Sequence, residues 1–320
     1  MCYDKEEIQM ILLKSLANLK EYGLNQVALC FGNFDGIHVG HQMLLRAQLA
    51  KAKELKQELV IVTFNPHPKK ILAVSNDPFL LTSREKKIEL LAGLGCKWLL
   101  EIAFTRDFST QSARQFLETY VMEHEYVRSI FLGWDFAFGS NKSGDSEAVK
   151  TICGERKNNP IEVFSFPAYQ FGGNNISSSL IREHLRQGKV DSVSQMLARN
   201  YSLSGLVVKG EGRGKIIGIP TANLAYSEDL VIPMRGVYST LCNYRGMIYK
   251  SVTNIGFNPT FNSTRAITVE THLIDFDETI YGEMIEIQFL KRIRDEMKFS
   301  SVNDLVDQIK KDIQTSKALP

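Results

Sequence analysis

The 320-residue chain has no dominant charge and no long apolar run, and its first residues do not suggest a secretory signal. Its 38 basic and 36 acidic side chains leave a formal charge of +2, too weak a bias to predict binding to nucleic acid or to an anionic membrane. No apolar run approaches the roughly 18 residues that a membrane span needs. The polar start MCYDKEEIQ has no apolar core or cleavage site of a secretory signal. We therefore expect a cytoplasmic globular protein without nucleic-acid or membrane partners.

Cysteine is also scarce, and its distribution argues against two kinds of site. The five cysteines are scattered, odd in number and without a C-x-x-C pair: Cys2, Cys30, Cys96, Cys153 and Cys242. This distribution argues against a disulfide framework and against a zinc cluster, and it suits a reducing compartment. We expect these thiols to be packing or surface groups rather than catalytic ones.

The first half of the chain alternates between two hydrophobic periods. Short continuous apolar runs predict buried strands at Val27–Phe31, Leu59–Phe64, Trp98–Ile102 and Ser129–Leu132. Helical spacing lies between them, at 44–55, from Thr82 with a capping box to Glu85, and around Phe116–Val121. This order predicts an α/β fold with a doubly wound parallel sheet. Ligands of such sheets bind beyond the carboxyl ends of the strands.

After Gly188 the pattern changes to short strands separated by Gly, Asn and Pro turns. The predicted strands are Leu203–Val208, Gly236–Asn243, Met247–Asn254, Thr268–Leu273 and Met284–Phe289. They indicate a small antiparallel barrel or sandwich, followed by an amphipathic helix at Val302–Ile313. The length suits two domains, and we place the boundary near residues 186–200, with domains 1–187 and 188–320.

The first predicted strand runs into a glycine-rich turn with two histidines, within Phe31–Gln42. Glycines such as Gly32 and Gly40 let the backbone turn sharply and approach a ligand. His38 and His41, three residues apart at a helix entrance, can both face a bound anion and donate hydrogen bonds to phosphate oxygens. One alternative is a turn histidine plus a capping one. The other is a metal site, although no Cys or carboxylate lies nearby at ligand spacing.

Three further segments could close this pocket. Thr63–Pro68 follows the second strand, Gly133–Gly139 follows the fourth, and Ile176–Arg182 enters a helix. Their candidate polar groups are Asn65, His67, Ser177, Ser178 and Arg182. Hydroxyls, backbone amides and a guanidinium there would favour phosphate. The alternatives are a rigid turn for the first segment and a helix cap for the serines.

These motifs occur in a specific order along the chain. The set G-x-F-D-G-x-H-x-G-H-Q, T-F-x-P-H-P, L-T-x-x-E-K, G-x-D-F-x-F-G and I-S-S-S-x-I-R resembles the FAD synthetase module of the bacterial bifunctional riboflavin kinase/FMN adenylyltransferase family. The L-T-x-x-E-K letters fall on Leu81, Thr82, Glu85 and Lys86. Ala137 and Ser179 depart from the pattern, since many relatives have Arg and Thr there. Ala137 puts one charge contact of the adenylyl site in doubt.

The resemblance implies a nucleotidylyltransferase domain of the H-x-G-H type. It implies catalytic roles for His38 and His41 in transferring an adenylyl group from ATP to FMN. The ATP and phosphate contacts that it implies are Gly32, Phe34, Gly40, Asn65, His67, Ser177, Ser178 and Arg182.

The second half contains another glycine-rich segment, Gly210–Lys215, with the sequence GEGRGK. It is no P-loop, because Lys215 is followed by Ile216, and it lacks the third glycine and the strand–helix context of a Rossmann fingerprint. Its backbone amides can still wrap a phosphate, the alternative being a flexible hairpin. Thr221 and Asn223 follow, two apart on an extended segment, so they point to one side and can share a Mg²⁺ ion.

Glu270 is the candidate base of this half. Its strand alternates, so Val269, Thr271 and Leu273 share one face and Glu270 the other, with Thr268 and His272. A strand carboxylate is an ordinary solvated edge residue unless it faces a site.

The whole C-terminal motif set, from G-x-G-R-G-K through G-I-P-T-A-N and N-I-G-x-N-P-T-F to V-E-T-H-L, resembles the riboflavin kinase module of the same family. The resemblance implies a six-stranded barrel, Thr221 and Asn223 on Mg²⁺ and ATP phosphates, and Glu270 as the base facing the ribityl hydroxyl. The remaining implied contacts are Gly210, Gly212, Gly214 and Lys215 for ATP, and Asn258, Thr260, Phe261 and Arg294 for flavin.

Together the two modules imply phosphorylation of riboflavin to FMN and then adenylylation of FMN to FAD, with riboflavin, FMN and ATP as substrates. Three alternatives remain open at this point. Only one module is active, the first module uses another nucleotide substrate, or the chain is a flavin-sensing regulator. The oligomeric state cannot be derived from the sequence.

Overall fold

The computed structural model describes residues 9–73, 77–134, 136–140, 143–171, 174–210, 212–258 and 266–319. The chain divides into two compact units, Met1–Asp77 with Thr82–Ile176 and Pro78–Leu81 with Ser177–Pro320. The contacts group helix α7 (Ser178–Arg186) with the second unit, whereas the sequence-based boundary after residue 187 assigned it to the first domain. That boundary stays a prediction.

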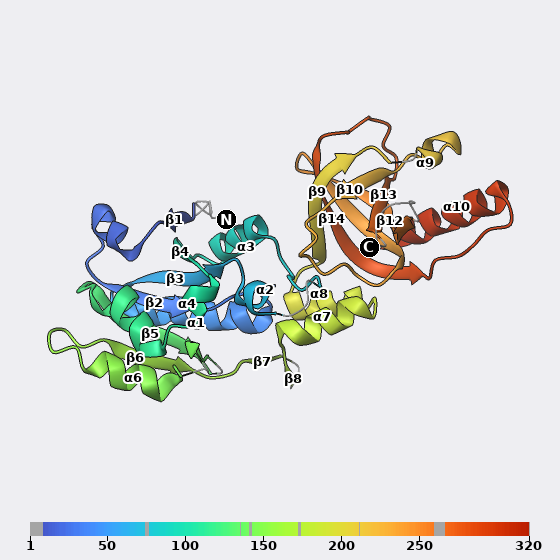
Figure 1. The fold of residues 1–320 in the computed structure, drawn as a ribbon. Coiled ribbons are helices and arrows are strands. Elements are labelled where there is room, and N and C mark those ends of the chain that lie inside the picture. The colour runs from blue at the N-terminus through green and yellow to red at the C-terminus, as the bar shows by residue number, and fades with distance from the viewer. Residues whose placement is uncertain are drawn as a thin grey trace. The chain divides into compact units, whose positions relative to one another are not determined.

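The first unit is built on a six-stranded parallel sheet in the order β1-β4-β3-β2-β5-β6 (Figure 1). The strands are β1 (Ile11–Leu13), β2 (Val27–Phe31), β3 (Glu58–Asn65), β4 (Trp98–Ala103), β5 (Val127–Gly133) and β6 (Glu162–Phe166). All four predicted strands are present, and β1 and β6 extend the sheet at its two edges. A separate two-stranded pair is formed by β7 (Gln170–Phe171) and β8 (Asn174–Asn175).

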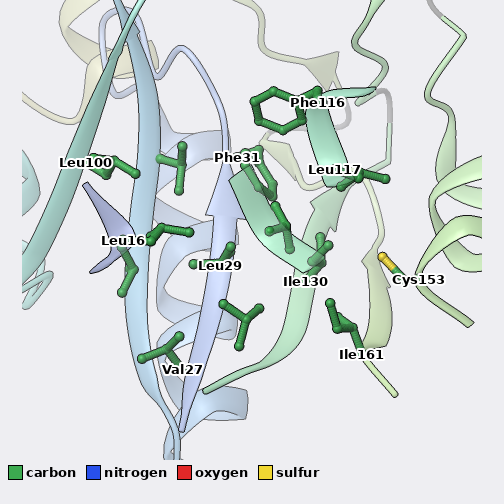
Figure 2. Packing of buried hydrophobic residues seen from close by; sticks show 14 of the residues in the cluster. Leu16, Val27, Leu29, Phe31, Leu100, Phe116, Leu117, Ile130, Cys153 and Ile161 are labelled. Atoms are coloured by element: carbon green, nitrogen blue, oxygen red, sulfur yellow. The ribbon is translucent and has the colours of Figure 1, made fainter. Parts of the chain in front are cut away.

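Helices cover both faces of this sheet, which confirms the doubly wound prediction. They are η1 (Leu16–Tyr22), α1 (Val39–Glu54), α2 (Pro68–Leu72), α3 (Arg84–Gly93), α4 (Arg106–Ser109), α5 (Ala113–Leu117), the π-helical turn η2 (Glu118–Met122) and α6 (Ser146–Gly154). Ala28 and Cys30 of β2 face α1 and α3, and Leu29 and Phe31 face the opposite core. Figure 2 shows that second core, where Phe116 of α5 packs on Phe31 with 5.6 Å between ring centroids.

The second unit contains a closed six-stranded antiparallel barrel in the order β10-β13-β12-β11-β14-β9. Its strands are β9 (Tyr201–Val208), β10 (Ala222–Ala225), β11 (Gly236–Tyr244), β12 (Met247–Asn258), β13 (Ala266–Leu273) and β14 (Met284–Arg294). The helices of this unit are α7, α8 (Val190–Leu197), α9 (Arg213–Ile216) and α10 (Val302–Ala318). The expected barrel is therefore present, and the short strand β10 completes it at the segment that carries Thr221 and Asn223.

Helix α10 packs on β11 and β12, and Figure 1 shows it beside β12. Ile313 packs against the buried cluster of Val237, Val252 and Ile274. A nearly buried ion pair adds to this contact: the Arg294 guanidinium lies 2.8 Å from Asp312 Oδ2, and the Asp312 side chain is 3% exposed. Removing one partner of such a pair leaves an uncompensated buried charge, at a cost of about 3–5 kcal/mol. Arg294 therefore holds the last helix on the barrel.

Two absences concern the residues that the structure describes. Within those ranges, no helix combines the length and the apolarity needed to cross a membrane. The four cysteines in those ranges, Cys30, Cys96, Cys153 and Cys242, are buried free thiols. Burial raises the pKa of each of these thiols, the reverse of what a nucleophilic cysteine requires.

Candidate active sites

The turn after β2 has an unusual backbone. Phe34, Gly36 and Ile37 have φ angles of 48°, 83° and 38°, and positive φ in a β-branched residue such as Ile37 is a true outlier. The Phe34 ring lies back against Gly32, where an added Cβ would come within 2.6 Å of the ring. Gly32 is thus required by close packing in the turn.

The two histidines of the turn stack on each other. The centroids of the His38 and His41 rings are 3.7 Å apart, with 15° between the planes. His38 is the N-cap of α1, and its Nδ1 accepts the backbone N–H of His41 at 3.3 Å. The neutral His38 ring therefore carries its proton on Nε2. Gly40 leaves room for this ring, because a Cβ there would lie 3.2 Å from it.

His41 is held neutral by its surroundings. Burial, the neighbouring His38 and the charge of Lys87 lower the pKa of His41 well below its ordinary value of 6.5. Its Nδ1 is buried without a hydrogen-bond partner among the described residues. The pair therefore supplies neutral imidazoles, which can donate hydrogen bonds to a phosphate without adding two positive charges.

Helix α3 and the segment just before it hold the turn through two hydrogen bonds. The hydroxyl of Thr82 accepts the Gly36 N–H at 3.3 Å, and Nζ of Lys87 donates to the Asn33 carbonyl at 3.0 Å. The predicted capping box at Thr82 is wrong by one residue, because Ser83 caps α3 by accepting the Lys86 N–H. Thr82 and Lys87 instead bond the histidine turn.

Asn65 and His67 lie where predicted, at the carboxyl end of β3, and β3 is parallel and adjacent to β2. His67 is the N-cap of α2, and its Nδ1 accepts the Lys69 N–H at 3.1 Å. The neutral His67 ring therefore also carries its proton on Nε2. Both side chains share the edge of the sheet with the histidine turn.

The segment after β5 has a clear packing role. Phe136 and Phe138 stack on Phe31, with centroid distances of 6.1 and 6.3 Å. Ala137 between them is exposed, and the adjoining Asp135 lies outside the described residues. The aromatic residues of this motif thus serve the core beneath the turn.

Ser177, Ser178 and Arg182 belong to α7 in the second unit. Ser177 is the N-cap, since its hydroxyl accepts the Leu180 N–H at 3.2 Å. The buried Arg182 donates from Nε to the Phe79 carbonyl and lies over the Phe79 ring. Their predicted role beside His38 and His41 stays a prediction.

In the barrel, strand register brings three polar residues into one row. Glu270 of β13 pairs with Asn223 of β10 on one side and with Asn254 of β12 on the other. All three are half-buried and alternate with buried neighbours such as Val269 and Thr271. The row therefore lies on the outer face of the barrel, and the predicted facing of Glu270 is confirmed.

The glycine-rich segment lies directly against this row. An added Cβ at Gly210 would come within 2.2 Å of Asn223 Nδ2, and one at Gly214 within 3.3 Å of Thr221 Oγ1. Lys215 in the short helix α9 is exposed, and Gly212 has a φ of 73°. Gly210 and Gly214 thus lie next to Asn223 and Thr221, and Asn223 pairs with Glu270. The ATP-binding role of these residues stays a prediction.

The oxygen donors of Thr221 and Asn223 suit the hard cation Mg²⁺, which prefers oxygen ligands and keeps waters and phosphate oxygens in its shell. The glycines at 210 and 214 carry no side chain that would fill the space above these two groups. The residues present therefore fit a magnesium–nucleotide site.

The predicted flavin contacts are described only in part. Thr260 and Phe261 lie outside the described residues, and the backbone of Asn258 pairs with Ala266 at the end of β12. Arg294 makes the ion pair with Asp312.

Sequence reasoning missed two residues beside the sites, Asn254 and Lys87. Asn254 opens the N-I-G-x-N-P-T-F motif, and the alternation of its strand could have placed it beside Glu270. Lys87 had no comparable signal, because the motif match stopped at Lys86.

Comparisons with known proteins find matches for both halves of the chain. A family model described as FAD synthetase matches residues 21–180, and one described as riboflavin kinase matches residues 197–319. The bifunctional riboflavin kinase/FMN adenylyltransferase of Bacillus subtilis is 33% identical over 290 residues, covering 89% of this chain and 90% of that protein. The protein of the same description from Haemophilus influenzae is 34% identical over 310 residues, covering 97% and 99%.

A solved structure described as a macrolide-efflux protein from Streptococcus pneumoniae superposes with a TM-score of 0.84 and 30% identity, over 97% of this chain and 99% of that one. The word efflux describes the Streptococcus pneumoniae protein and is not applied to this chain.

The fold and the two sites define a class of protein in which a nucleotidylyltransferase unit and a riboflavin kinase barrel share one chain. Within that class, the chain belongs to the bifunctional riboflavin kinase/FMN adenylyltransferase family.

Proposed function

We propose that the chain makes FAD from riboflavin in two ATP-dependent steps, one in each unit. The observation that supports this proposal is the coexistence of two separate candidate sites, the stacked His38–His41 turn and the Asn223–Glu270–Asn254 row. A regulator built on inactive modules would not need both, and an enzyme with another nucleotide substrate would not need the barrel row. The buried free thiols agree with a cytoplasmic location.

In the kinase step, the ribityl hydroxyl oxygen of riboflavin attacks the γ-phosphorus of ATP, the bond to ADP breaks, and Glu270 accepts the hydroxyl proton. Thr221 and Asn223 would hold Mg²⁺, which neutralises charge on the phosphates when bound. The backbone of Gly210–Gly214 wraps the phosphates, and the flavin contacts extend over Asn258, Thr260, Phe261 and Arg294. Most of the catalysis then comes from positioning.

In the adenylyl step, a phosphate oxygen of FMN attacks the α-phosphorus of a second ATP, and pyrophosphate leaves. The nucleophile is already an anion, so no base is required. The site must instead reduce repulsion between two negative groups, which the neutral donors His38 and His41 do at the entrance of α1. Asn65 and His67 are proposed to add phosphate contacts in this unit. Ser177, Ser178 and Arg182 are proposed as phosphate contacts at α7.

The experiment is to incubate the full chain with riboflavin, ATP and Mg²⁺ and to separate the flavins by chromatography. FMN followed by FAD supports the proposal. FMN alone, or FAD only from supplied FMN, would limit the chain to one step, and the absence of both products would refute the proposal. Omitting Mg²⁺ in the presence of a chelator should stop FMN formation.

A further inference from the structure

The histidine turn is strained and is held from outside itself. Phe34 and Ile37 adopt left-handed backbone conformations, and such strain persists only where the surrounding structure imposes it. Two hydrogen bonds impose this conformation on the turn. The Gly36 N–H donates to the hydroxyl of Thr82, which precedes α3, and Nζ of Lys87 in α3 donates to the Asn33 carbonyl. The bond from Lys87 lies at the start of the turn, directly after β2.

Lys87 is an unusual residue for such a role, because it is only 8% exposed. A buried ammonium is costly unless it is hydrogen-bonded and electrically compensated. Burial lowers the pKa of Lys87, and the carboxylates of Asp35 and Glu101 offset part of this effect. The ammonium also has a hydrogen-bond acceptor, the Asn33 carbonyl at 3.0 Å. A methionine of similar length would fill the same space without that cost, so the retained charge calls for a reason beyond packing.

The charge of Lys87 acts on the histidine pair. It contributes, after burial and after His38, to the lowering of the His41 pKa. The other charged groups around Lys87 are Asp35 in the turn, Glu101 on β4 and Arg84 on α3, and Arg84 is bonded to Glu101 at 2.7 Å. The charge of Arg84 is thus paired with Glu101, whereas Lys87 contributes to the lowered pKa of His41.

We propose that Lys87 is a positioning residue of the adenylyl-transfer site: its buried ammonium fixes the Phe31–His38 turn through a charge-assisted hydrogen bond to the Asn33 carbonyl. This inference rests on the proposed adenylyl transfer. On helix α3, Lys87 faces inward, whereas Nζ of Lys86 bonds Glu89 at 2.8 Å on the surface. The positioning role is therefore assigned to Lys87 and not to Lys86.

The test compares Lys87→Met with the matched neighbour variant Lys86→Met in the full chain. We expect Lys87→Met to lower kcat for FAD formation from FMN about 10- to 100-fold, the usual effect of a small misplacement of reacting groups. It should also raise the pKa of His41, followed by NMR of the imidazole signals and assigned with a His41 variant. Lys86→Met should leave both unchanged, and riboflavin phosphorylation should be unaffected in both variants.

Lys87→Gln separates the hydrogen bond from its charge, because it keeps a donor for Asn33 and removes the charge. Its His41 pKa should rise as in Lys87→Met, with a smaller loss of rate, and it decides the question where Lys87→Met fails to fold. A wild-type rate or an unchanged His41 titration in the folded variants overturns the proposal. If the wild-type chain makes no FAD while the His41 shift is present, the adenylyl function fails and the electrostatic placement of Lys87 stands.

Discussion

The histidine site of the first unit is one continuous stretch of chain, Phe31–Gln42, whereas the barrel site draws Asn223, Asn254 and Glu270 from three strands. In the turn, the groups are held by local geometry: a cap, a ring stack and left-handed residues. In the barrel they are held by cross-strand register, and a shift of one residue would move the carboxylate to the interior. Local strain and long-range register are thus two different ways to hold candidate site residues in one chain.

This difference predicts that a substitution can inactivate one site and leave the other active. Among the variants considered, Glu270→Gln should cause the largest loss of activity. Loss of the base should lower FMN formation by about 10²- to 10⁴-fold. FAD formation from supplied FMN should remain at the wild-type rate, measured by separating the flavins. Glu283→Gln, on an exposed ion pair with Arg245 in the same unit, is the control and should be silent. Parallel loss of both reactions would contradict a site confined to the barrel.

His38→Ala is the converse experiment. Removing one preorganised donor from a transition state costs about 10²–10³ in kcat. The same change also removes the cap that accepts the His41 N–H, so we expect the loss at the upper end of this range. Riboflavin phosphorylation should be unchanged in the same preparation. His124→Asn, which alters a histidine bonded to Tyr126 in the same unit, provides the comparison. An unaffected adenylylation rate would remove His38 from the mechanism.

A third variant tests whether the glycine segment and the strand row form one surface. In Gly210→Ala the new methyl group would meet Asn223 Nδ2 at 2.2 Å, so the loop and the amide cannot both keep their places. We expect kcat/KM for ATP in the kinase reaction to fall about tenfold, as displaced binding groups do. Gly246→Ala, at an open hairpin position with φ of 80°, should cost stability but not activity. Equal effects of the two variants would show that the contact with Asn223 has no role.

The contrast also explains how much could be predicted from the sequence. Four of the six strands of the sheet and the facing of Glu270 followed from hydrophobic periods, because these are written in consecutive residues. The six-stranded barrel followed from the resemblance of the motif set to the riboflavin kinase module. Asn254 and Lys87 were missed, because their importance depends on which strand or helix lies next to them. The cap of α3 was misplaced by one residue, since Thr82 and Ser83 are both good caps and only the tertiary bond to Gly36 decides between them.

The smallest predicted effect is a pH dependence of the stability of the first unit. Burial lowers the pKa of His41 well below 6.5, and it also lowers the pKa of His124 in the same unit. The unfolded chain therefore binds more protons than the folded one just below pH 6.5, so the free energy of unfolding must fall as the pH decreases through this range. Above pH 6.5 this contribution to stability is fully present.

Both tryptophans, Trp98 and Trp134, lie in the first unit, so their fluorescence in urea titrations follows that unit alone. We expect the midpoint to decrease from pH 7 to pH 5.5, with a smaller decrease in His41→Gln and a further reduction when His124→Asn is added. A slope that survives both substitutions would have to come from other groups. Such a result would contradict a role of His41 in the acid sensitivity of this unit. If His41 is neutral in the folded state, the pH dependence of the midpoint must decrease when its imidazole is removed.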